Sequence, residues 1–281
     1  MKITKMHGAG NDFILINNFT QQLGEDVLPE LARSLCSRRL SVGADGLILA
    51  DKPLAEGDIR MVFYNSDGSR AEMCGNGARC LARFAYEQGL VNQEMTIETL
   101  AGPVEAKRID DTNYWIRLPN PSLIVKTTID FEDTEIASHY VELGNPGVPH
   151  LCVELNDLAT ISQAKLYKMG HYLRNHPDLP HGANVNFYQS LDRGHYLEKT
   201  FERGVEDFTM ACGTGSAAVA LAVQTDQPDL RHTKIHFTVP GGELFIESRW
   251  LNETVLSVDL IGPTEVVFVA ELNEIPFGLK T

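Results

Sequence analysis

Two cysteines, Cys74 and Cys212, stand in matching short motifs and are the residues best suited to acid–base chemistry. Residues 73–78 (MCGNGA) and 211–216 (ACGTGS) share one six-residue pattern. The second residue is Cys, the third and fifth are Gly, the fourth is polar and the sixth is small. The two motifs lie about half of the 281-residue chain apart. An apolar helix pattern follows each motif, and after it come a strand pattern and a glycine turn. Matching order and spacing favour a duplicated unit over coincidence.

A cysteine in this position has unusual chemistry. The first turn of a helix carries unpaired N–H groups and partial positive charge, which lower a thiol pKa from about 8.5 towards neutrality. The glycines let backbone N–H groups approach and bind a carboxylate. Two such helix ends aimed at one cleft would place an acid and a base on opposite faces of an α-carbon. The N–H groups would stabilise the charge that spreads into the α-carboxylate. This chemistry inverts an α-carbon without a cofactor.

The ordinary alternative is a helix-initiating turn that buries an inert thiol. For a single motif that interpretation would be preferred, but two motifs at matched spacing favour catalysis. No Cys-x-x-Cys pair is present, which argues against a zinc ribbon or a thioredoxin-type site. We therefore expect no metal. The remaining cysteines, expected to be dispensable for chemistry, are Cys36, Cys80 and Cys152.

Short runs with alternating apolar and polar residues dominate the chain and predict many strands. Helical patterns are fewer, which predicts a β-rich α+β protein. The expected helices are residues 29–37, 78–88, 162–173 and 216–224. The expected strands include residues 2–6, 13–17, 47–51, 59–65, 95–100, 114–118, 139–143, 151–155, 183–189, 235–239, 243–248, 254–260 and 266–272.

The composition of the chain limits the classes of molecule that it is expected to bind. The hydrophobic fraction of 43% and the charged fraction of 22% are ordinary for a globular protein. A net charge of -14 disfavours non-specific binding to nucleic acid. The longest apolar runs are too short to cross a membrane, and the first residues lack the apolar region of a secretory signal. We expect a cytoplasmic protein with a small-molecule partner, no nucleic acid and no membrane. The oligomeric state is open, and a homodimer is one candidate.

The motifs closely resemble those of the diaminopimelate epimerase family. Together the matches span residues 3 to 242 in the family's order, and the set is specific although CGNG alone is weak. The matching segments are residues 6–13 (MHGAGNDF), 42–46 (VGADG), 64–69 (YNSDGS), 72–80 (EMCGNGARC), 182–187 (GANVNF), 202–205 (ERGV) and 211–215 (ACGTG).

The resemblance implies a fold and a domain division. It implies two similar β-rich domains, each a curved, mostly antiparallel sheet wrapped around a central helix. The expected first domain is residues 1–118, completed by residues 263–281, and the expected second domain is residues 119–262.

The resemblance also implies roles for individual residues. Cys74 and Cys212 correspond to the acid/base pair, and no cofactor is expected. The groups that would hold the substrate are Asn11, Asn65, Asn184, Glu202 and Arg203. The groups that would hold the α-carboxylate are Gly75, Asn76, Gly213 and Thr214. Arginine suits a carboxylate through its fork of N–H donors, and asparagine suits both ends of a zwitterion.

One segment departs from the family pattern of Gly-Asn-Pro-His. Here residues 144–150 read GNPGVPH. One alignment keeps His150 as a supporting residue but puts Val148 in the place of the asparagine. The other keeps Asn145 and puts Gly147 in the place of the histidine. We prefer the first, because His150 leads directly into a predicted strand.

The leading hypothesis is epimerisation of LL-diaminopimelate to meso-diaminopimelate in lysine and cell-wall biosynthesis. The alternative within the family is a cofactor-independent racemase of another amino acid, since the altered segment concerns the far end of the substrate. A third hypothesis, of another class, is a thiol redox or binding protein that uses the cleft only for recognition. The doubled cysteine motif disfavours the third.

Overall fold

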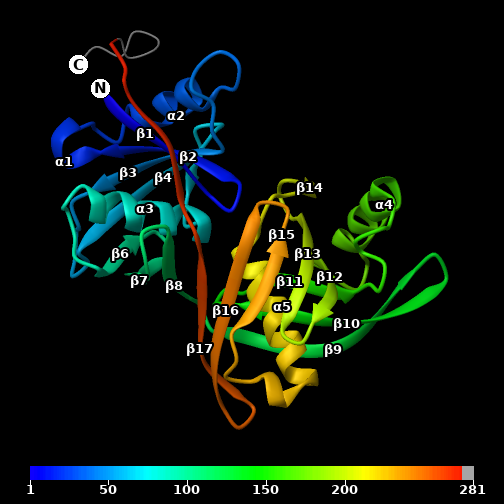
Figure 1. The fold of residues 1–281 in the computed structure, drawn as a ribbon. Coiled ribbons are helices and arrows are strands. Elements are labelled where there is room, and N and C mark those ends of the chain that lie inside the picture. The colour runs from blue at the N-terminus through cyan, green and yellow to red at the C-terminus, as the bar shows by residue number, and fades with distance from the viewer. Residues whose placement is uncertain (274–281) are drawn as a thin grey trace. The chain divides into compact units, whose positions relative to one another are not determined.

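The computed structural model describes residues 1–273, which form two compact units. Among the described residues, unit 1 comprises Met1–Ile116 and residues 262–273, and unit 2 comprises Arg117–Ile261. Both divisions between the units fall inside a strand. Figure 1 shows the elements of both units.

Unit 1 contains nine strands and three helices among the described residues. The helices are α1 (Asn18–Gln21), α2 (Leu28–Cys36) and α3 (Gly75–Glu87). The strands are β1 (Lys2–Gly8), β2 (Asn11–Asn17), β3 (Gly46–Asp51), β4 (Ile59–Asn65), β5 (Arg70–Ala71), β6 (Glu94–Thr99), β7 (Gly102–Arg108), β8 (Asn113–Leu118) and β18 (Glu265–Glu271).

Unit 2 contains the same number of strands and helical segments among its residues. The helices are α4 (Gln163–Arg174), α5 (Gly213–Asp226) and the 3-10 turn η1 (Pro228–Leu230). The strands are β9 (Pro121–Phe131), β10 (Thr134–Leu143), β11 (Val148–Glu154), β12 (Asn184–Asp192), β13 (His195–Glu202), β14 (Asp207–Phe208), β15 (Ile235–Val239), β16 (Gly242–Leu251) and β17 (Thr254–Pro263).

The two sheets have the same topology. In unit 1 the strands follow the order β18, β1, β2, β3, β4, β6, β7, β8, and in unit 2 the order β9, β10, β11, β12, β13, β15, β16, β17. The third and fourth strands are parallel in both units, as are the fifth and sixth, and the other neighbours are antiparallel. This identity confirms the duplication that the cysteine motifs indicate.

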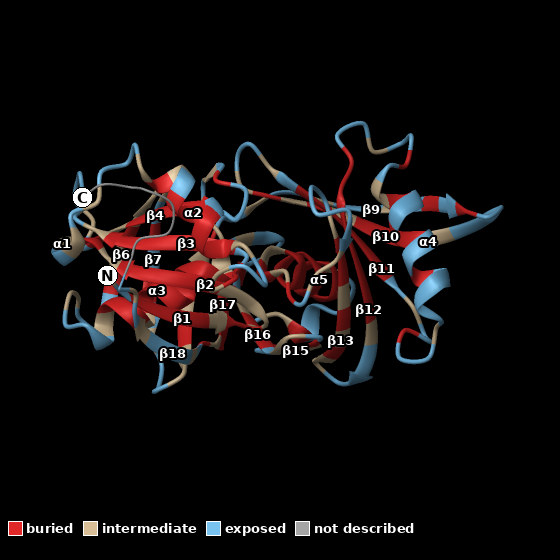
Figure 2. Ribbon diagram, turned by 90° about the horizontal axis from the view of Figure 1, so that it is seen from above, coloured by how far each residue is buried: buried red, intermediate tan, exposed pale blue. Residues whose placement is uncertain are grey.

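A helix lies inside the curve of each sheet. Helix α3 packs against β1 and β2 near one edge of its sheet and against β7 near the other, so the sheet curls around it. Helix α5 packs in the same way against β10, β11, β12 and β16. Its sequence, GTGSAAVALAVQTD, is apolar nearly all round, and it is buried along most of its length (Figure 2).

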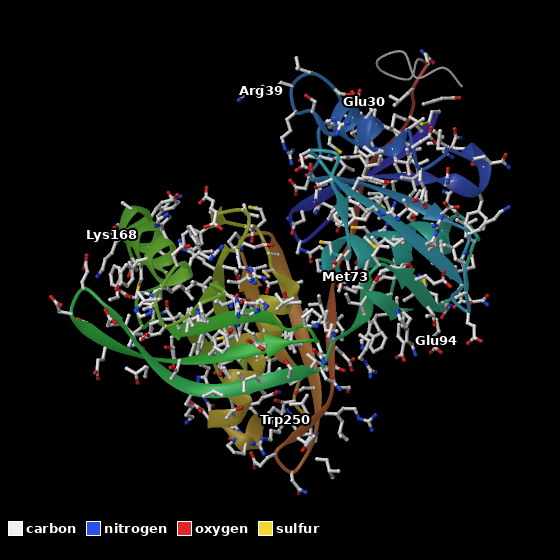
Figure 3. The ribbon with its side chains drawn as sticks, turned by 180° about the vertical axis from the view of Figure 1, so that it is seen from behind. Glu30, Arg39, Met73, Glu94, Lys168 and Trp250 are labelled. Atoms are coloured by element: carbon white, nitrogen blue, oxygen red, sulfur yellow. The ribbon has the colours of Figure 1, made fainter. Side chains whose placement is uncertain are left out.

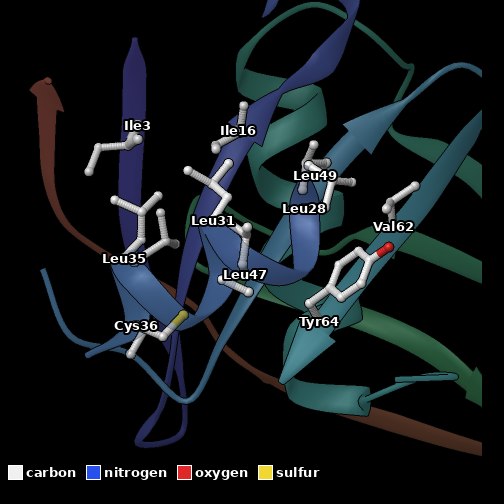
Figure 4. Close-up of a cluster of buried hydrophobic side chains, with 13 residues drawn as sticks. Ile3, Ile16, Leu28, Leu31, Leu35, Cys36, Leu47, Leu49, Val62 and Tyr64 are labelled. Carbon is white, nitrogen blue, oxygen red and sulfur yellow. The ribbon is translucent and has the colours of Figure 1, made fainter. Parts of the chain in front are cut away.

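A second helix covers the outer face of each sheet. In unit 1, the amphipathic helix α2 places Leu28, Leu31 and Leu35 against the apolar side chains of β1 to β4 (Figure 4). In unit 2, α4 places Leu166, Met169 and Leu173 against β11 to β13. The parallel strands on either side of each helix require a crossover connection, and these helices provide it.

The far end of α5 is fixed by a buried polar cluster. The Oε1 atom of Gln224 accepts hydrogen bonds from Ser248 Oγ (2.6 Å) and from Trp250 Nε1 (3.1 Å). Trp250 is labelled in Figure 3. Because each donor comes from β16, the C-terminal half of α5 is held to one strand, and its N-terminal turn is placed accordingly.

The four expected helices and the expected strands are present, which confirms the α+β fold class. Strands β7, β9 and β13 and the two-residue strands β5 and β14 are additional to the expected set. Helices α3 and α5 begin three residues earlier than expected, at the glycines of the cysteine motifs. Within residues 1–273, no helix has the length and apolarity to span a membrane.

Candidate active site

Cys74 and Cys212 occupy the same structural position, each in its own unit. Each is the N-cap residue of the central helix, with extended backbone angles of φ -139° and ψ 123° for Cys74 and φ -125° and ψ 103° for Cys212. The carbonyl of Cys74 accepts the first helical hydrogen bond from Ala78 N (2.8 Å), and that of Cys212 accepts from Ser216 N (2.9 Å). Figure 3 labels Met73, the residue before Cys74. Both thiols therefore sit at a helix N-terminus.

The positive ends of the two central helices carry no acidic side chain. Neither first turn contains an aspartate or a glutamate, and in the second turn the Gly215 N–H forms a hydrogen bond with the Cys212 side chain. The positive end of each helix is thus uncompensated by its own first turn. Gly75 and Asn76 form this turn in unit 1, and Gly213 and Thr214 form it in unit 2.

Close packing requires glycine in the second of these turns. A Cβ atom on Gly215 would lie 2.3 Å from Asn186 Oδ1, and one on Gly213 would lie 2.5 Å from Leu260 Cδ2. The turn therefore lies directly on the side chains of β12 and β17, and a side chain at either position would force Asn186 or Leu260 to move.

In unit 1, a chain of amide groups leads from the helix turn towards solvent. Asn76 Nδ2 donates to Asn11 Oδ1 at 2.5 Å, and Asn11 Nδ2 lies 3.4 Å from Asp45 Oδ2. Behind Asn76, the buried Arg79 donates from Nη2 to Asn76 Oδ1 at 2.7 Å. The structure thus brings together Asn11 and Asn76, which the sequence predicts as site residues, and adds Arg79, which it does not.

Asn65 is the last residue of β4 and is exposed. Its Nδ2 atom donates to Ser69 Oγ at 3.0 Å, within the turn that leads to β5. Asn65 corresponds in topology to Glu202, the last residue of β13. These two predicted substrate groups therefore stand at equivalent strand ends, each shortly before its cysteine.

An ion-pair cluster borders this part of unit 1. Arg38 contacts both Asp12 (2.6 Å) and Asp45 (2.9 Å), and Lys5 contacts Asp12 at 2.7 Å. Burial raises the pKa of Asp12, but the hydrogen bonds from Arg38 and Lys5 outweigh it and hold that pKa below its ordinary value. The cluster keeps Asp12 ionised and fixes the segment that carries Asn11.

In unit 2, the surroundings of Cys212 favour the neutral thiol. Burial, and then the negative charge of Glu202, raise the pKa of Cys212, while the Thr214 hydroxyl and the Gly215 N–H act in the opposite direction. The Cys212 Sγ atom lies 3.5 Å from Thr214 Oγ1. This finding differs from the lowered pKa expected from the helix N-terminus alone, because burial beside carboxylates exceeds the effect of the turn.

His150 lies in the core of unit 2, in β11, with 0% exposure. Its Nδ1 atom lies 3.2 Å from Asn186 Nδ2, and Asn186 Oδ1 accepts from Thr200 Oγ1 at 3.0 Å. This arrangement assigns the donor role to the amide and places the ring proton on Nε2. Burial lowers the pKa of His150 to about 3, so the ring is neutral. We describe it as a support for Asn186, against which Gly215 packs.

Asn184 is buried and holds neighbouring backbone. Its Nδ2 atom donates to Pro149 O at 3.2 Å, and its Oδ1 atom accepts from Arg203 N at 2.8 Å. Arg203 itself is exposed and donates from Nη1 to His181 O at 3.1 Å. Among residues 1–273, no carboxylate forms an ion pair with Arg203. Asn184 thus positions the backbone that presents Arg203.

Glu198 is a functional candidate that the sequence does not reveal. It lies in β13 with 1% exposure, and Ser216 Oγ of α5 donates to its carboxylate. Burial raises the pKa of Glu198 to about 8, so the side chain is largely protonated at neutral pH. No short motif surrounds Glu198. The only signal in the sequence is its place among the alternate residues of β13 whose side chains face the core.

The other three cysteines are buried. Burial raises the pKa of both Cys36 and Cys80 to about 12, and it raises the pKa of Cys152 well above its ordinary value. These thiols are unsuited to proton transfer near neutral pH.

One cluster in the described part of the chain has the residue types of a metal centre. The potential ligand atoms of His195, His236 and Glu243 lie within 4.8 Å of one another. The two imidazole rings are stacked, with centroids 3.9 Å apart and planes 9° apart. A metal ion binds in the plane of each imidazole, and two parallel planes at this spacing cannot share one ion. The groups instead form hydrogen bonds with Thr238 and with each other.

Comparison with known proteins identifies the family. The model of the family described as diaminopimelate epimerase matches residues 3–118 and 143–266. The chain is 36% identical to a diaminopimelate epimerase of Aquifex aeolicus, with 98% of each chain covered. It is 38% identical to one of Desulforudis audaxviator, over 95% of this chain and 98% of that protein.

Solved structures agree on the fold. A phenazine biosynthesis protein of the PhzF family from Bacillus anthracis superimposes with a TM-score of 0.73 at 16% identity, covering 97% of this chain and 98% of that chain. A hydroxyproline epimerase from Agrobacterium vitis superimposes with a TM-score of 0.69 at 18% identity, covering 96% and 91%. At these identities the likeness concerns the fold alone. On the sequence matches over nearly its whole length, the chain belongs to the diaminopimelate epimerase family.

Proposed function

We propose that this chain is a cofactor-independent diaminopimelate epimerase that interconverts LL- and meso-diaminopimelate, with Cys74 and Cys212 as the paired acid and base. The family model and the names of the curated relatives support the reaction. Its place would be lysine and cell-wall biosynthesis, and so the cytoplasm.

The observation that carries the mechanism is the repetition of one arrangement. Two units of identical topology each place a cysteine as the N-cap of the central helix. Inversion of an α-carbon needs a base on one face and an acid on the other, and two equivalent thiols meet that need. As the α-proton leaves, charge develops on the α-carboxylate, which the N–H groups of residues 75–76 and 213–214 are suited to stabilise.

The predicted substrate groups suit the far end of diaminopimelate, which carries a second ammonium and a second carboxylate. Arg203 is an exposed guanidinium with a fork of donors for a carboxylate. Glu202, at the end of β13, suits an ammonium, and Asn11 and Asn65 offer amide groups on unit 1. A substrate with one charged end would leave several of these groups unused.

A racemase of another amino acid is the second candidate, and Val148 is the observation that favours it. Val148 begins β11 with 38% exposure, two residues before His150, where the family pattern has an asparagine. An apolar side chain there suits a less polar substrate. Assays with proline, glutamate and diaminopimelate separate the two candidates, because only the epimerase requires the distal charges.

The test is exchange of the α-hydrogen. Incubation with LL-diaminopimelate in deuterated water should give meso product with deuterium at the inverted carbon, measured by NMR and mass spectrometry. Cys74→Ala and Cys212→Ala should each abolish inversion, because one face of the carbon loses its proton carrier. Cys36→Ala and Cys152→Ala are the matched controls and should retain it. Full activity in either of the first two variants would exclude the two-thiol mechanism.

A further inference from the structure

Arg79 is a buried cation directly behind the first cysteine turn. It lies in α3, five residues after Cys74, and its exposure is 0%. Its guanidinium donates to Asn76 Oδ1 (2.7 Å) and to the Gly75 carbonyl (3.4 Å), and its Nε atom has no hydrogen-bond partner. Burial lowers the pKa of Arg79 to about 10, so the group stays charged at neutral pH.

No carboxylate within residues 1–273 forms an ion pair with Arg79, although a buried charge is costly without a partner of opposite sign. Electrostatic interactions with the thiols of Cys80 and Cys74 favour the charged form of Arg79, although burial outweighs them in its pKa. Cys80 is fully buried, and burial raises its pKa to about 12 in spite of Arg79. Cys74, in contrast, is only half-buried.

Arg79 also orients two amide groups. A guanidinium only donates hydrogen bonds, so the oxygen of Asn76 must face Arg79 and the nitrogen must face away. That nitrogen donates to Asn11 Oδ1 at 2.5 Å, which turns the Asn11 nitrogen outward to Asp45. One buried charge thereby sets the orientation of both predicted substrate groups.

Several other charged groups on the strands around α3 are paired. On β1 and β2, Lys5 and Asp12 form an ion pair (2.7 Å), and His7 also lies on β1. On the remaining strands, Asp51 pairs with Arg60, Glu94 with Lys107 and Arg108 with Asp111, and Glu98 accepts hydrogen bonds from backbone N–H groups.

Unit 2 lacks this cation. The residue five positions after Cys212 is Ala217, and the charged group that acts most strongly on Cys212 is the carboxylate of Glu202. The two half-sites are equivalent in backbone and opposite in electrostatics.

We propose that Arg79 is a positioning residue that holds Cys74 as the thiolate in the free enzyme, while Cys212 rests as the thiol. Cys74 is then the resting base and Cys212 the resting acid. In one turnover the Cα–H bond breaks and its proton forms the Cys74 S–H bond, while the Cys212 S–H bond breaks and its proton forms the new Cα–H bond. The next turnover in the same direction follows once solvent returns one proton to Cys212 and removes one from Cys74. This inference rests on the proposed acid/base pair.

The first test uses the unmodified protein without substrate. Iodoacetamide alkylates thiolates, so the rate of modification at each cysteine is followed from pH 5 to pH 10 by peptide mass spectrometry. Cys74 should reach half its maximal rate about one pH unit or more below Cys212. Equal midpoints, or an earlier reaction of Cys212, would overturn the proposal.

Variants of Arg79 distinguish an effect of its charge on Cys74 from a purely structural role. Arg79→Met should raise the alkylation midpoint of Cys74 by about one pH unit or more and leave that of Cys212 unchanged. Arg79→Lys keeps a charge but loses the fork, so the Cys74 midpoint should stay near that of the unmodified protein while kcat/KM falls. Arg83→Met is the matched control, because Arg83 lies one turn further along α3 and pairs with Glu87 (2.7 Å). A purely structural Arg79 would alter stability in both variants and move neither midpoint.

The two proposals fail separately. If the midpoints differ as expected but no α-deuterium enters diaminopimelate, the proposed function is wrong and the Arg79 inference stands for the thiol. If deuterium enters but Arg79→Met leaves the Cys74 midpoint in place, the function stands and the inference is wrong. Where Arg79→Met does not fold, the order of the midpoints in the unmodified protein decides.

Discussion

Arg203 is exposed and is held in place through its backbone. Asn184 accepts from its N–H group, and the guanidinium keeps most of its donors for other contacts. We predict that Arg203→Lys lowers kcat/KM for diaminopimelate by about a hundredfold, because a lysine cannot form the two parallel bonds to a carboxylate. That loss corresponds to about 2.7 kcal/mol. Steady-state kinetics with both isomers provide the measurement.

The control for this prediction is Arg193→Lys. Arg193 is also exposed in unit 2, and it pairs with Asp229 at 2.5 Å on the surface. Surface pairs of this kind contribute at most about 1 kcal/mol, and the change should leave the kinetics intact. A near-normal kcat/KM for Arg203→Lys would show that Arg203 does not bind a substrate carboxylate through two parallel hydrogen bonds.

Glu198 makes stability depend on pH. Its folded pKa of about 8 lies above the ordinary value of 4.5, so between these values the folded chain binds more protons than the unfolded chain. The free energy of unfolding therefore falls as pH rises through this window, by up to about 1.4 kcal/mol per pH unit. Glu198→Gln keeps an oxygen for Ser216 and cannot ionise. We predict that the variant loses this part of the pH dependence.

Urea unfolding at pH 5.5, 6.5 and 7.5 measures the effect as the difference between the variant and the parent. The difference should grow in favour of Glu198→Gln as pH rises. Glu247→Gln, an exposed residue that pairs with Lys234 at 3.0 Å, is the control and should give a constant difference. A constant difference for Glu198→Gln as well would mean that Glu198 ionises normally in the folded chain.

The helix turn at Cys212 is the element whose packing is tightest. A Cβ on Gly215 would meet Asn186 Oδ1 at 2.3 Å, and Asn186 is held by His150 and Thr200. We predict that Gly215→Ala displaces the start of α5, costs about 1–3 kcal/mol of stability through overpacking and removes most of the activity. Thermal unfolding and α-deuterium exchange measure the two effects.

Gly24→Ala is the matched control for the glycine change. The new Cβ there would meet only the Asp26 carboxylate oxygen at 2.5 Å, and this exposed side chain can turn away. Stability and exchange should both stay near those of the parent. Unchanged activity in Gly215→Ala would show that the turn tolerates displacement.

At the scale of elements, the sequence predicted the strands and helices whose residues follow a regular local pattern. The alternation of apolar and polar residues indicated most strands, and the Cys-Gly-x-Gly motifs indicated both central helices. Strand β9 (PSLIVKTTIDF) was not predicted, because its exposed residues interrupt the alternation and its pairing with β10 provides the stability. Strand β13 (HYLEKTFE) was not predicted either, because a buried glutamate and a buried threonine stand where the pattern requires apolar residues.

The candidate site divides in the same way. The sequence alone predicts Cys74, Cys212 and the glycine turns as site residues, because their chemistry depends on residues next to them in the chain. Arg79 and Glu198 are not, since their properties arise from burial by strands distant in the chain. The prediction of a low pKa at Cys212 was wrong for this reason, because the motif shows neither the burial of the thiol nor the effect of the Glu202 charge on it.

At the scale of the whole molecule, the proposed mechanism requires two thiols on opposite faces of one carbon. Thiols that serve the same atom can approach disulfide distance when no substrate separates them. We predict that mild oxidation inactivates the enzyme, that dithiothreitol restores it, and that peptide mapping finds a Cys74–Cys212 link. The buried Cys36, Cys80 and Cys152 should stay reduced. Reversible inactivation with Cys74 and Cys212 both still reduced would contradict the shared site.

The pairing of β18 with β1 has a consequence for synthesis on the ribosome. Unit 2 runs without interruption from Arg117 to Ile261, so all of it has been translated before unit 1 is complete. Unit 1 begins at Met1 but lacks its edge strand until residues 265–271 emerge. A nascent chain stopped at residue 262 would hold both cysteine turns, with the edge of β1 still open to pairing. Translation therefore finishes the first unit last, with a strand that carries none of the catalytic groups.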